Sequence, residues 1–246
     1  MNRLRPAVTL LLLAAPVAAC SAHWNTDDDG KPGIAAAGTG GERHWTVSGF
    51  DAIDIGGAGD VQVHVGPAFS LTATGSPDLL DKVKITQDGH TLDIGRRSGD
   101  GWGDGGKLHF VVTMPAITGA GIGGSGTIAI DRVEGKAFEG NIGGSGKLDV
   151  AAMKVGKASF NVGGSGDIAA AGTTQALSVS IGGSGSIKAT PLSAQTADIS
   201  IAGAGKIAAT VTQTAAVTIM GSGDVTITGG AKCSVTKMGA GAVHYG

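Results

Sequence analysis

Apolar and polar residues alternate along most of the chain from Trp45 onward, which is the period of a half-buried β-strand. Phe50-Asp51-Ala52-Ile53-Asp54-Ile55 and Val61-Gln62-Val63-His64-Val65 are two examples, and turn-forming residues separate such runs throughout. Only the segment Pro77–Val83 has the pattern of a helical turn. The alternation therefore predicts an all-β fold with almost no helix.

A unit of about 20 residues repeats through the second half of the chain. Each unit has a polar residue, Ile, Gly-Gly-Ser-Gly, a polar residue and Ile or Leu, as in Asn141–Leu148 and Ser180–Ile187, and an earlier copy spans Asp54–Val61. The closing glycines lie 20, 20, 19, 20, 18 and 18 residues apart, at Gly126, Gly146, Gly166, Gly185, Gly205, Gly223 and Gly241. This period predicts a β-solenoid, in which each strand pairs with its equivalent in the next coil.

Stacking of equivalent residues predicts two apolar columns that form the core. The column before the turn contains Ile122, Ile142, Val162, Ile181, Ile201 and Ile219, and the column after it contains Ile128, Leu148, Ile168, Ile187, Ile207 and Val225. On the outside we expect a polar ladder of Asn141, Asn161, Ser180, Ser200 and Thr218, and beside it a column of Thr127, Lys147, Asp167, Ser186, Lys206 and Asp224. In the second of these, Lys147 is expected to pair with Asp167 and Lys206 with Asp224.

The repeated glycines are interpreted as structural turn residues. A tight bend repeated in register requires positive φ angles and leaves no room for the Cβ atoms of adjacent coils. The residues assigned to this role are Gly124, Gly126, Gly144, Gly146, Gly164, Gly166, Gly183, Gly185, Gly203, Gly205, Gly221 and Gly223.

The first 19 residues have the charged, apolar and small-residue order of a bacterial secretory signal. The sequence Val17-Ala18-Ala19-Cys20 resembles the lipobox of bacterial lipoproteins, in which the Cys is acylated and becomes the first residue of the mature chain. An ordinary cleaved signal followed by chance by a Cys is the alternative. Residues 20–41 lack periodicity and are rich in breakers, so we interpret them as a flexible tether. Ser21 after the lipobox favours the outer membrane of a Gram-negative bacterium.

Charge excludes some classes of partner. The chain has 18 basic and 20 acidic residues, and removal of residues 1–19 takes away Arg3 and Arg5 and no acid. The mature chain is mildly acidic, without a basic patch, so we expect no nucleic-acid partner and no electrostatic attraction to anionic lipids. We therefore expect the lipid at Cys20 to hold the protein to the membrane.

The opening Phe50–Val61, the later Gly89–Ile94 and the run of Gly-Ser-Gly units resemble the head GIN domain family of putative autotransporter adhesins, over residues 43–240. The resemblance implies a right-handed parallel β-helix similar in outline to pectin lyases, a role in adhesion and no established catalytic residues. The sequence has no C-terminal barrel or coiled-coil stalk, which departs from the name of the family.

Glycine-rich ligand sites compete with the structural interpretation. In Gly163–Asp167 the Asp comes one position too early for a calcium-binding nonapeptide, and its equivalents in other repeats include Lys147 and Lys206. Phosphate loops require a following helix and a Lys-Ser/Thr pair, and collagen requires glycine at every third position. A polysaccharide lyase or hydrolase is the main enzymatic alternative, but the acids of the later repeats are spread over several coils.

A few residues outside the repeats are also candidates. Trp102 lies among acids and glycines in the loop of residues 96–106 and is our candidate ligand contact, although packing of the Trp on the coil surface is favoured. The six histidines have no metal-ligand spacing. Cys233 alternates with polar neighbours and is expected in the core.

These observations together predict a right-handed parallel β-helix of seven or eight coils, with an irregular first part at residues 42–115 and regular coils at 116–246. We expect a non-catalytic, lipid-anchored envelope protein without metal or cofactor. Adhesion or interaction with a cell-surface or glycan ligand is the first hypothesis, and a structural scaffold is the second. The open edge of the last coil makes a homo-oligomer a further possibility.

Overall fold

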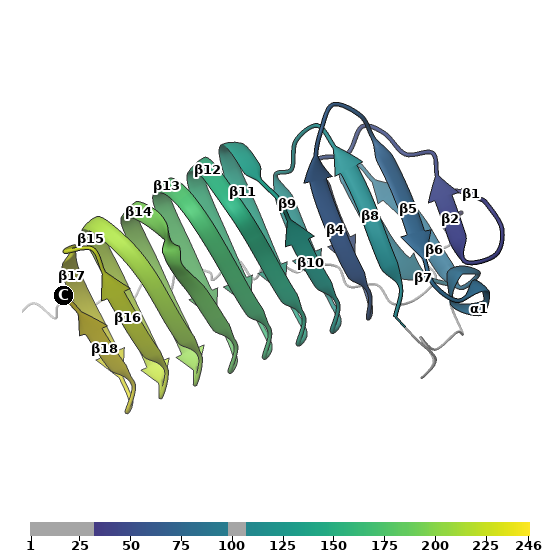
Figure 1. Cartoon of the computed structure of the whole chain (residues 1–246). Coiled ribbons are helices and arrows are strands. Elements are labelled where there is room, and N and C mark those ends of the chain that lie inside the picture. Colours follow the sequence, from purple (N-terminus) through teal and green to yellow (C-terminus); the bar gives the residue numbers. More distant parts are fainter. Residues whose placement is uncertain (1–31, 98–106) are drawn as a thin grey trace, which may run out of the picture.

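The computed structural model describes residues 32–97 and 107–246, whose 18 strands form one continuous sheet wound into a β-solenoid (Figure 1). The fold is 67% strand and 2% helix, with about six turns of about 20 residues each. The predicted β-solenoid is confirmed. No helix in the described ranges is long and apolar enough to cross a bilayer.

The elements of the first part are short. They are β1 (Ala36–Ala37), β2 (Glu42–Trp45), β3 (Ala52–Ile55), β4 (Asp60–Val65), β5 (Ser70–Thr74), α1 (Pro77–Leu80), β6 (Val83–Asp88), β7 (Thr91–Arg96) and β8 (His109–Met114). The elements of the coils are longer: β9 (Gly119–Ile122), β10 (Thr127–Ile130), β11 (Val133–Ile142), β12 (Lys147–Val162), β13 (Asp167–Ile181), β14 (Ser186–Gly203), β15 (Lys206–Gly221), β16 (Asp224–Thr228), β17 (Lys232–Met238) and β18 (Ala242–Tyr245).

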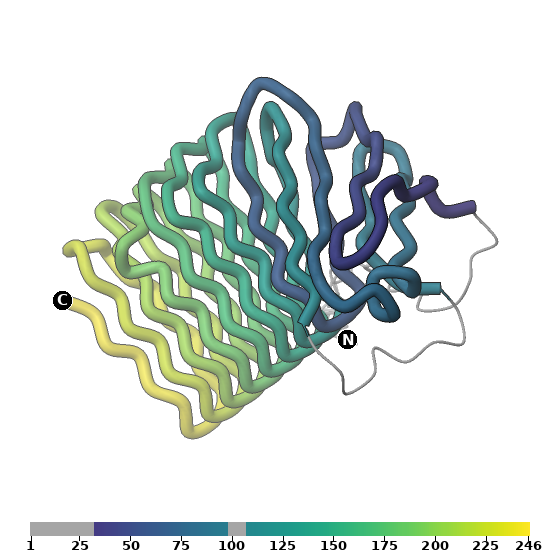
Figure 2. Tube along the Cα trace, turned by 45° about the vertical axis from the view of Figure 1, so that its right-hand side comes forward, coloured from purple at the N-terminus to yellow at the C-terminus, as the bar shows by residue number. Residues whose placement is uncertain are grey.

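Each coil bends at the glycine-rich corner, which separates two sides of the solenoid. The strand segments that lead into the corners form the entry face: β7, β3, β9, the ends of β11–β15, and β17. The segments that leave the corners form the exit face: β8, β4, β10, the beginnings of β12–β15, β16 and β18. Figure 2 shows these rows of equivalent segments side by side along the solenoid.

Both predicted apolar columns are confirmed. Ile122 pairs in parallel with Ile142, and this register continues through the whole column to Ile219. The second column runs in register from Ile128 to Val225, and all twelve side chains are at most 2% exposed. A strand of this length cannot bury its apolar face alone, so the stacking of coils creates the core.

The corner glycines are explained by close approach between coils and, at most positions, not by positive φ. A Cβ atom on Gly124 would lie 2.6 Å from the Gly57 carbonyl oxygen, and one on Gly146 would lie 2.5 Å from the Gly126 oxygen. Among the twelve corner glycines, all within the described residues, only Gly203 and Gly221 have φ in the left-handed range, at 148° and 131°. The prediction of repeated positive φ is therefore wrong for the other ten. These need glycine because backbone atoms of the neighbouring coil, and at some positions such as Gly166 and Gly205 also an Ile side chain, occupy the Cβ position.

The order of the first coils in space differs from their order along the chain. The coil of β3 and β4 lies between that of β7 and β8 and that of β9 and β10, with parallel pairing on both sides. The segment 115–118 passes across the β3–β4 coil, where the backbone N–H of Thr118 donates to the Asp51 carbonyl over 2.7 Å. Simple stacking in chain order would have placed the β3–β4 coil at the end of the solenoid.

An antiparallel cap covers the N-terminal end of the stack. β5 pairs with β8 and β2, β1 pairs with β2, and β6 pairs with β7, all antiparallel. The predicted helical turn is present as α1, which begins with Pro77 and buries Leu79 and Leu80. The backbone N–H of Ile34 donates to the Ile85 carbonyl over 2.8 Å, so ordered contacts begin before residue 42.

The seam beside β4 is closed by two residues of the next coil. The Asp131 carboxylate accepts a hydrogen bond from the Val65 backbone N–H at 3.1 Å, and the Arg132 guanidinium donates to the Val65 carbonyl. These bonds satisfy backbone groups at the place where the chain leaves the coil for β5 instead of continuing around it.

The C-terminal coil is more exposed than the others. β17 pairs with β15 alone and β18 with β16 alone within the described sheet, so the outer edges of both strands carry no strand partner. Met238 is 63% and Tyr245 59% exposed. Cys233, predicted as a core residue, is only partly buried, because no described coil covers this side of it.

Candidate functional site

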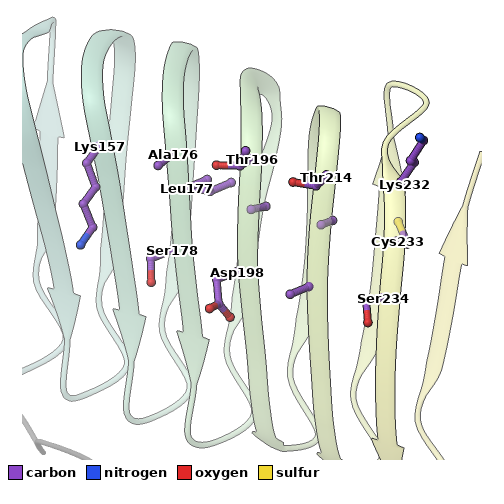
Figure 3. Close-up of a pocket in the computed structure, with 13 residues that line it drawn as sticks. Lys157, Ala176, Leu177, Ser178, Thr196, Asp198, Thr214, Lys232, Cys233 and Ser234 are labelled. Atoms are coloured by element: carbon purple, nitrogen blue, oxygen red, sulfur yellow. The ribbon is translucent and has the colours of Figure 1, made fainter.

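A shallow groove crosses the entry face over five consecutive coils, from β12 to β17 (Figure 3). Its volume is about 560 Å³. One row of its lining follows the register Lys157, Ala176, Thr196, Thr214, Lys232, and a second follows Ser178, Asp198, Ala216, Ser234. The groove therefore runs along the solenoid axis and across the strands.

Small side chains make the depression. The outward side chains of Ala176 and Ala216 are single methyl groups that rise little above the sheet. The inward residues Ala197 and Ala215, which also line the groove, are small and buried. Lys157 and Lys232 are both exposed and stand at opposite ends, as Figure 3 shows. Four coil steps separate them, which corresponds to about 19 Å at the usual strand spacing.

The charged side chains of the groove have no partner in the part of the chain that the structure describes. Among the described residues, Lys157, Asp198 and Lys232 take part in no ion pair and no side-chain hydrogen bond. Asp198 lies on the central coil of the five. The groove thus has a carboxylate at its centre and one ammonium group at each end, all open to a ligand.

Hydroxyl groups supply the remaining polarity. Ser178, Thr214 and Ser234 line the groove with Thr196, whose hydroxyl donates to the Gln175 carbonyl over 3.3 Å. Cys233 lies at the C-terminal end, where desolvation raises the pKa of its thiol and so favours the neutral form. These groups can exchange hydrogen bonds with a polar ligand without offering a strong nucleophile.

The groove contains a single carboxylate, which bears on the enzymatic alternative. Glycoside hydrolysis normally uses a pair of carboxyl groups on either side of the scissile bond, and Asp198 has no acidic neighbour in the lining. In the described ranges, no group of three or more His, Cys, Asp or Glu side chains is arranged to hold a metal ion. His44, His64 and His109 each lie beside a different carboxylate, at Glu42, Asp131 and Asp60.

The outer polar ladder predicted from the sequence lies next to the groove on the same face. Its register runs from Asn141 through Asn161, Ser180 and Ser200 to Thr218. The side-chain amide of Asn161 donates to that of Asn141 over 2.9 Å. This ladder is confirmed as a stacking feature of neighbouring coils.

The charged column of the exit face has the predicted register but not the predicted ion pairs. Lys147 is in register with Asp167, yet its ammonium nitrogen lies 2.6 Å from the carboxylate of Asp149, two positions along the same strand. This hydrogen bond to Asp149 raises the pKa of Lys147, and Asp167 contributes least. Lys206 and Asp224 are also in register but form no ion pair in the described part.

The two candidate site residues outside the repeats lie beyond what the structure describes. Cys20 precedes residue 32, and Trp102 falls within residues 98–106. Along the chain, Trp102 falls between β7 and β8. The lipidation of Cys20 and the ligand contact of Trp102 stay predictions.

Sequence reasoning missed the groove. One row of its lining, Lys157, Ala176, Thr196, Thr214 and Lys232, occupies equivalent positions in successive repeats. This row lies four positions before the predicted ladder of Asn161, Ser180, Ser200 and Thr218. Alignment of that part of the repeat would have revealed a row that is cationic at its two ends and small between them. This row varies much more from coil to coil than the corner motif does, so it gives a weaker repeat signal.

Comparisons with known proteins support the fold and identify a family. The family model described as "Putative auto-transporter adhesin, head GIN domain" matches residues 49–231. No curated protein sequence matches the chain.

Among solved structures, a protein from Bacteroides fragilis described as a putative adhesin is 22% identical, with a TM-score of 0.80, covering 85% of this chain and 98% of its own. A putative adhesin from Parabacteroides merdae is 19% identical, with a TM-score of 0.68 and coverage of 85% and 97%. A protein from Parabacteroides distasonis described as a putative lipid binding protein is 24% identical, with a TM-score of 0.66 and coverage of 86% and 98%.

These identities support a common fold. The family model covers most of the chain, including the first coils and nearly all of the regular repeats. The chain therefore belongs to the head GIN domain family of putative auto-transporter adhesins.

Proposed function

We propose that this protein is an exported adhesion or interaction module of the cell envelope, held to the membrane by a lipid on Cys20. Membership of an adhesin-like family supports a place at the cell surface. The lipobox-like sequence before Cys20 supports the anchor, and the mildly acidic mature chain has no basic patch to attract anionic lipids.

The entry-face groove is the single observation that carries the interaction role. It presents hydroxyls and three charged side chains, unpaired among the described residues, over five coils, and the strands of the first four coils, β12 to β15, are paired on both sides. Such a surface can bind an extended ligand at little cost in protein ordering, because the side chains are held in register by the coils.

A lyase or hydrolase receives less support from the same groove. The one carboxylate, Asp198, lies two coil steps from either Lys, which is about 10 Å at the usual spacing. Neither ammonium group lies within hydrogen-bond reach of Asp198, so the carboxylate and a Lys cannot act together as an acid–base pair. A structural envelope scaffold needs no groove, and the cell-binding test below separates it from adhesion.

The full chain, expressed in a Gram-negative host, tests both parts of the proposal. Incorporation of labelled palmitate is expected for the wild type and lost in Cys20→Ala, with Cys233→Ala as the matched control that keeps the label. Labelling that persists in Cys20→Ala would contradict the anchor.

Adhesion is measured by binding of the same cells to host-cell layers and to immobilised polysaccharides. Cells with the wild-type protein are expected to adhere more strongly than cells without it. Equal adhesion of the two, with the protein accessible to added protease at the cell surface, would leave the scaffold role and overturn the adhesin.

A further inference from the structure

The strand pairing beneath most of the groove excludes one common mode of peptide binding there. A peptide usually joins a sheet by pairing with a free strand edge. Here β12 to β15, which lie beneath most of the groove, are paired with neighbours on both sides, so their backbone groups are already used. Only β17, at the C-terminal end of the groove, has an outer edge without a strand partner among the described residues. A ligand that lies across β12 to β15 must therefore be recognised through side chains.

The coil spacing fits a ligand that repeats along its length. Successive lining residues such as Ala176, Thr196 and Thr214 are one coil apart, about 4.8 Å. A linear polysaccharide in an extended conformation advances by a similar length for each sugar ring. Five coils can therefore present one set of polar groups to each of about five rings.

The charges of the groove favour an acidic ligand. The chain as a whole has a net charge of −2, while the groove lining has two Lys and one Asp. The ammonium groups of Lys157 and Lys232 have no carboxylate partner among the described residues. The residues that line the groove include no aromatic ring, so stacking on a sugar face cannot supply the affinity.

We propose that the entry-face groove binds a linear acidic polysaccharide, a polyuronate, laid along the solenoid axis. Carboxylates of two rings contact Lys157 and Lys232, and the central Asp198 accepts hydrogen bonds from ring hydroxyls between them. Ser178, Thr214 and Ser234 complete the contacts to hydroxyl groups. This inference rests on the proposed interaction function and gives its ligand class.

Binding of oligoalginates to the full-length protein in detergent micelles tests the proposal by calorimetry. Oligomers of about six units are expected to bind, and dimers to bind at least about tenfold more weakly, because a dimer cannot reach both Lys residues. Carboxyl-reduced, neutral oligomers of the same length are expected to lose most of the affinity. Raising the salt concentration is expected to weaken binding of the acidic oligomer.

The variant Lys157→Gln/Lys232→Gln is expected to bind the six-unit oligomer about tenfold or more weakly than the wild type. The matched control, Lys188→Gln/Lys206→Gln, removes two exit-face charges and is expected to bind like the wild type. Equal binding by the two double variants, or equal binding of acidic and neutral oligomers, would overturn the proposal.

The cell experiment distinguishes this failure from failure of the proposed function. Adhesion that persists in Lys157→Gln/Lys232→Gln cells, with no binding of oligoalginate to the wild type, would refute the polyuronate ligand and leave the adhesin role intact. Loss of oligoalginate binding and of adhesion together in that variant would support both.

Discussion

The regular coils and the N-terminal cap are stabilised in different ways. In the coils, Ile142, Val162 and Ile181 each stack on the equivalent residue of the neighbouring coil, so the same packing contact is repeated. In the cap, antiparallel strands and a short helix meet unlike neighbours, as Trp45 does opposite Leu71. Repetition therefore makes a region predictable from sequence, while the closure of the stack depends on pairings that occur only once.

The same contrast appears in the polar contacts. In the coils, equivalent polar side chains bond to each other, as the Asn161 amide does to Asn141. The cap and the seam rely on individual bonds: Arg43 to Asp81 over 2.7 Å, and Asp131 to the Val65 backbone. Substitutions in the two regions should therefore differ in size and in type of effect.

The largest effect is expected for Gly164→Ala in the coils. The Cβ atom would overlap the carbonyl oxygen of Gly144, which is backbone of the preceding coil and cannot move aside. We expect a loss of about 3 kcal/mol in the free energy of unfolding, measured by chemical denaturation.

The neighbouring residue provides a matched control for this corner. A Cβ atom on Gly163 would lie 3.8 Å from the Ile142 carbonyl oxygen, an ordinary contact, so Gly163→Ala should change stability by less than about 0.5 kcal/mol. Similar losses for both variants would show that glycine is required for backbone conformation and not for close approach.

A smaller effect is expected for Asp131→Ala at the seam. The Val65 N–H would lose its acceptor, and His64, 3.4 Å from the same carboxylate, would lose its neighbour. Because Asp131 is partly exposed, water can replace it, and we expect a loss of about 1 kcal/mol. Asp224→Ala, which removes a carboxylate that has no ion pair in the described part, should have less effect in the same denaturation series. An equal effect would mean that the seam bond contributes nothing specific.

The smallest effect is expected for Asp54→Asn in the first coil, and it should depend on pH. Burial raises the pKa of Asp54 above its usual 3.8, so the native state holds this proton more tightly than the unfolded chain does. The wild type therefore loses stability as the pH rises from below 3.8 through the native pKa, because it must then bury a charge. The Asn variant carries no such charge.

We expect Asp54→Asn to gain less than about 1 kcal/mol over the wild type at neutral pH, relative to their difference near pH 3. Thermal unfolding of both proteins at the two pH values measures this gain. A constant difference across pH would contradict the assigned cause.

Sequence patterns were sufficient to predict the strand register of the coils, because each residue pairs with the equivalent residue of the neighbouring repeat. The columns of Ile122 and Ile128 were found from spacing alone. The same reasoning placed Lys147 opposite Asp167 but could not predict that a flexible side chain would reach Asp149 on its own strand. It also assigned Cys233 to the core, because burial depends on a covering coil that alternation does not reveal.

The cap and the groove were beyond this reasoning for other reasons. The copy at Asp54–Val61 was recognised, but its position between two later segments depends on long-range pairing that a local repeat does not encode. The groove depends on which outward positions are small in five coils at once, a property of columns and not of any single repeat. Cys20 and Trp102, the predicted lipid and ligand residues, lie outside the described ranges, so these two predictions stay as they were.

The interior position of the β3–β4 coil has a consequence for the route by which the chain folds. Emerging first, it can pair only with β7 and β8, whose arrival requires closure of a loop longer than one repeat. That step builds the cap on one edge and leaves the other edge as a template. The coil of β9 and β10 then pairs with this template across 67 residues of sequence, from Ala52 to Gly119. Each coil after it adds by closing a loop of about 20 residues, so the long-range steps come early and growth then proceeds in one direction.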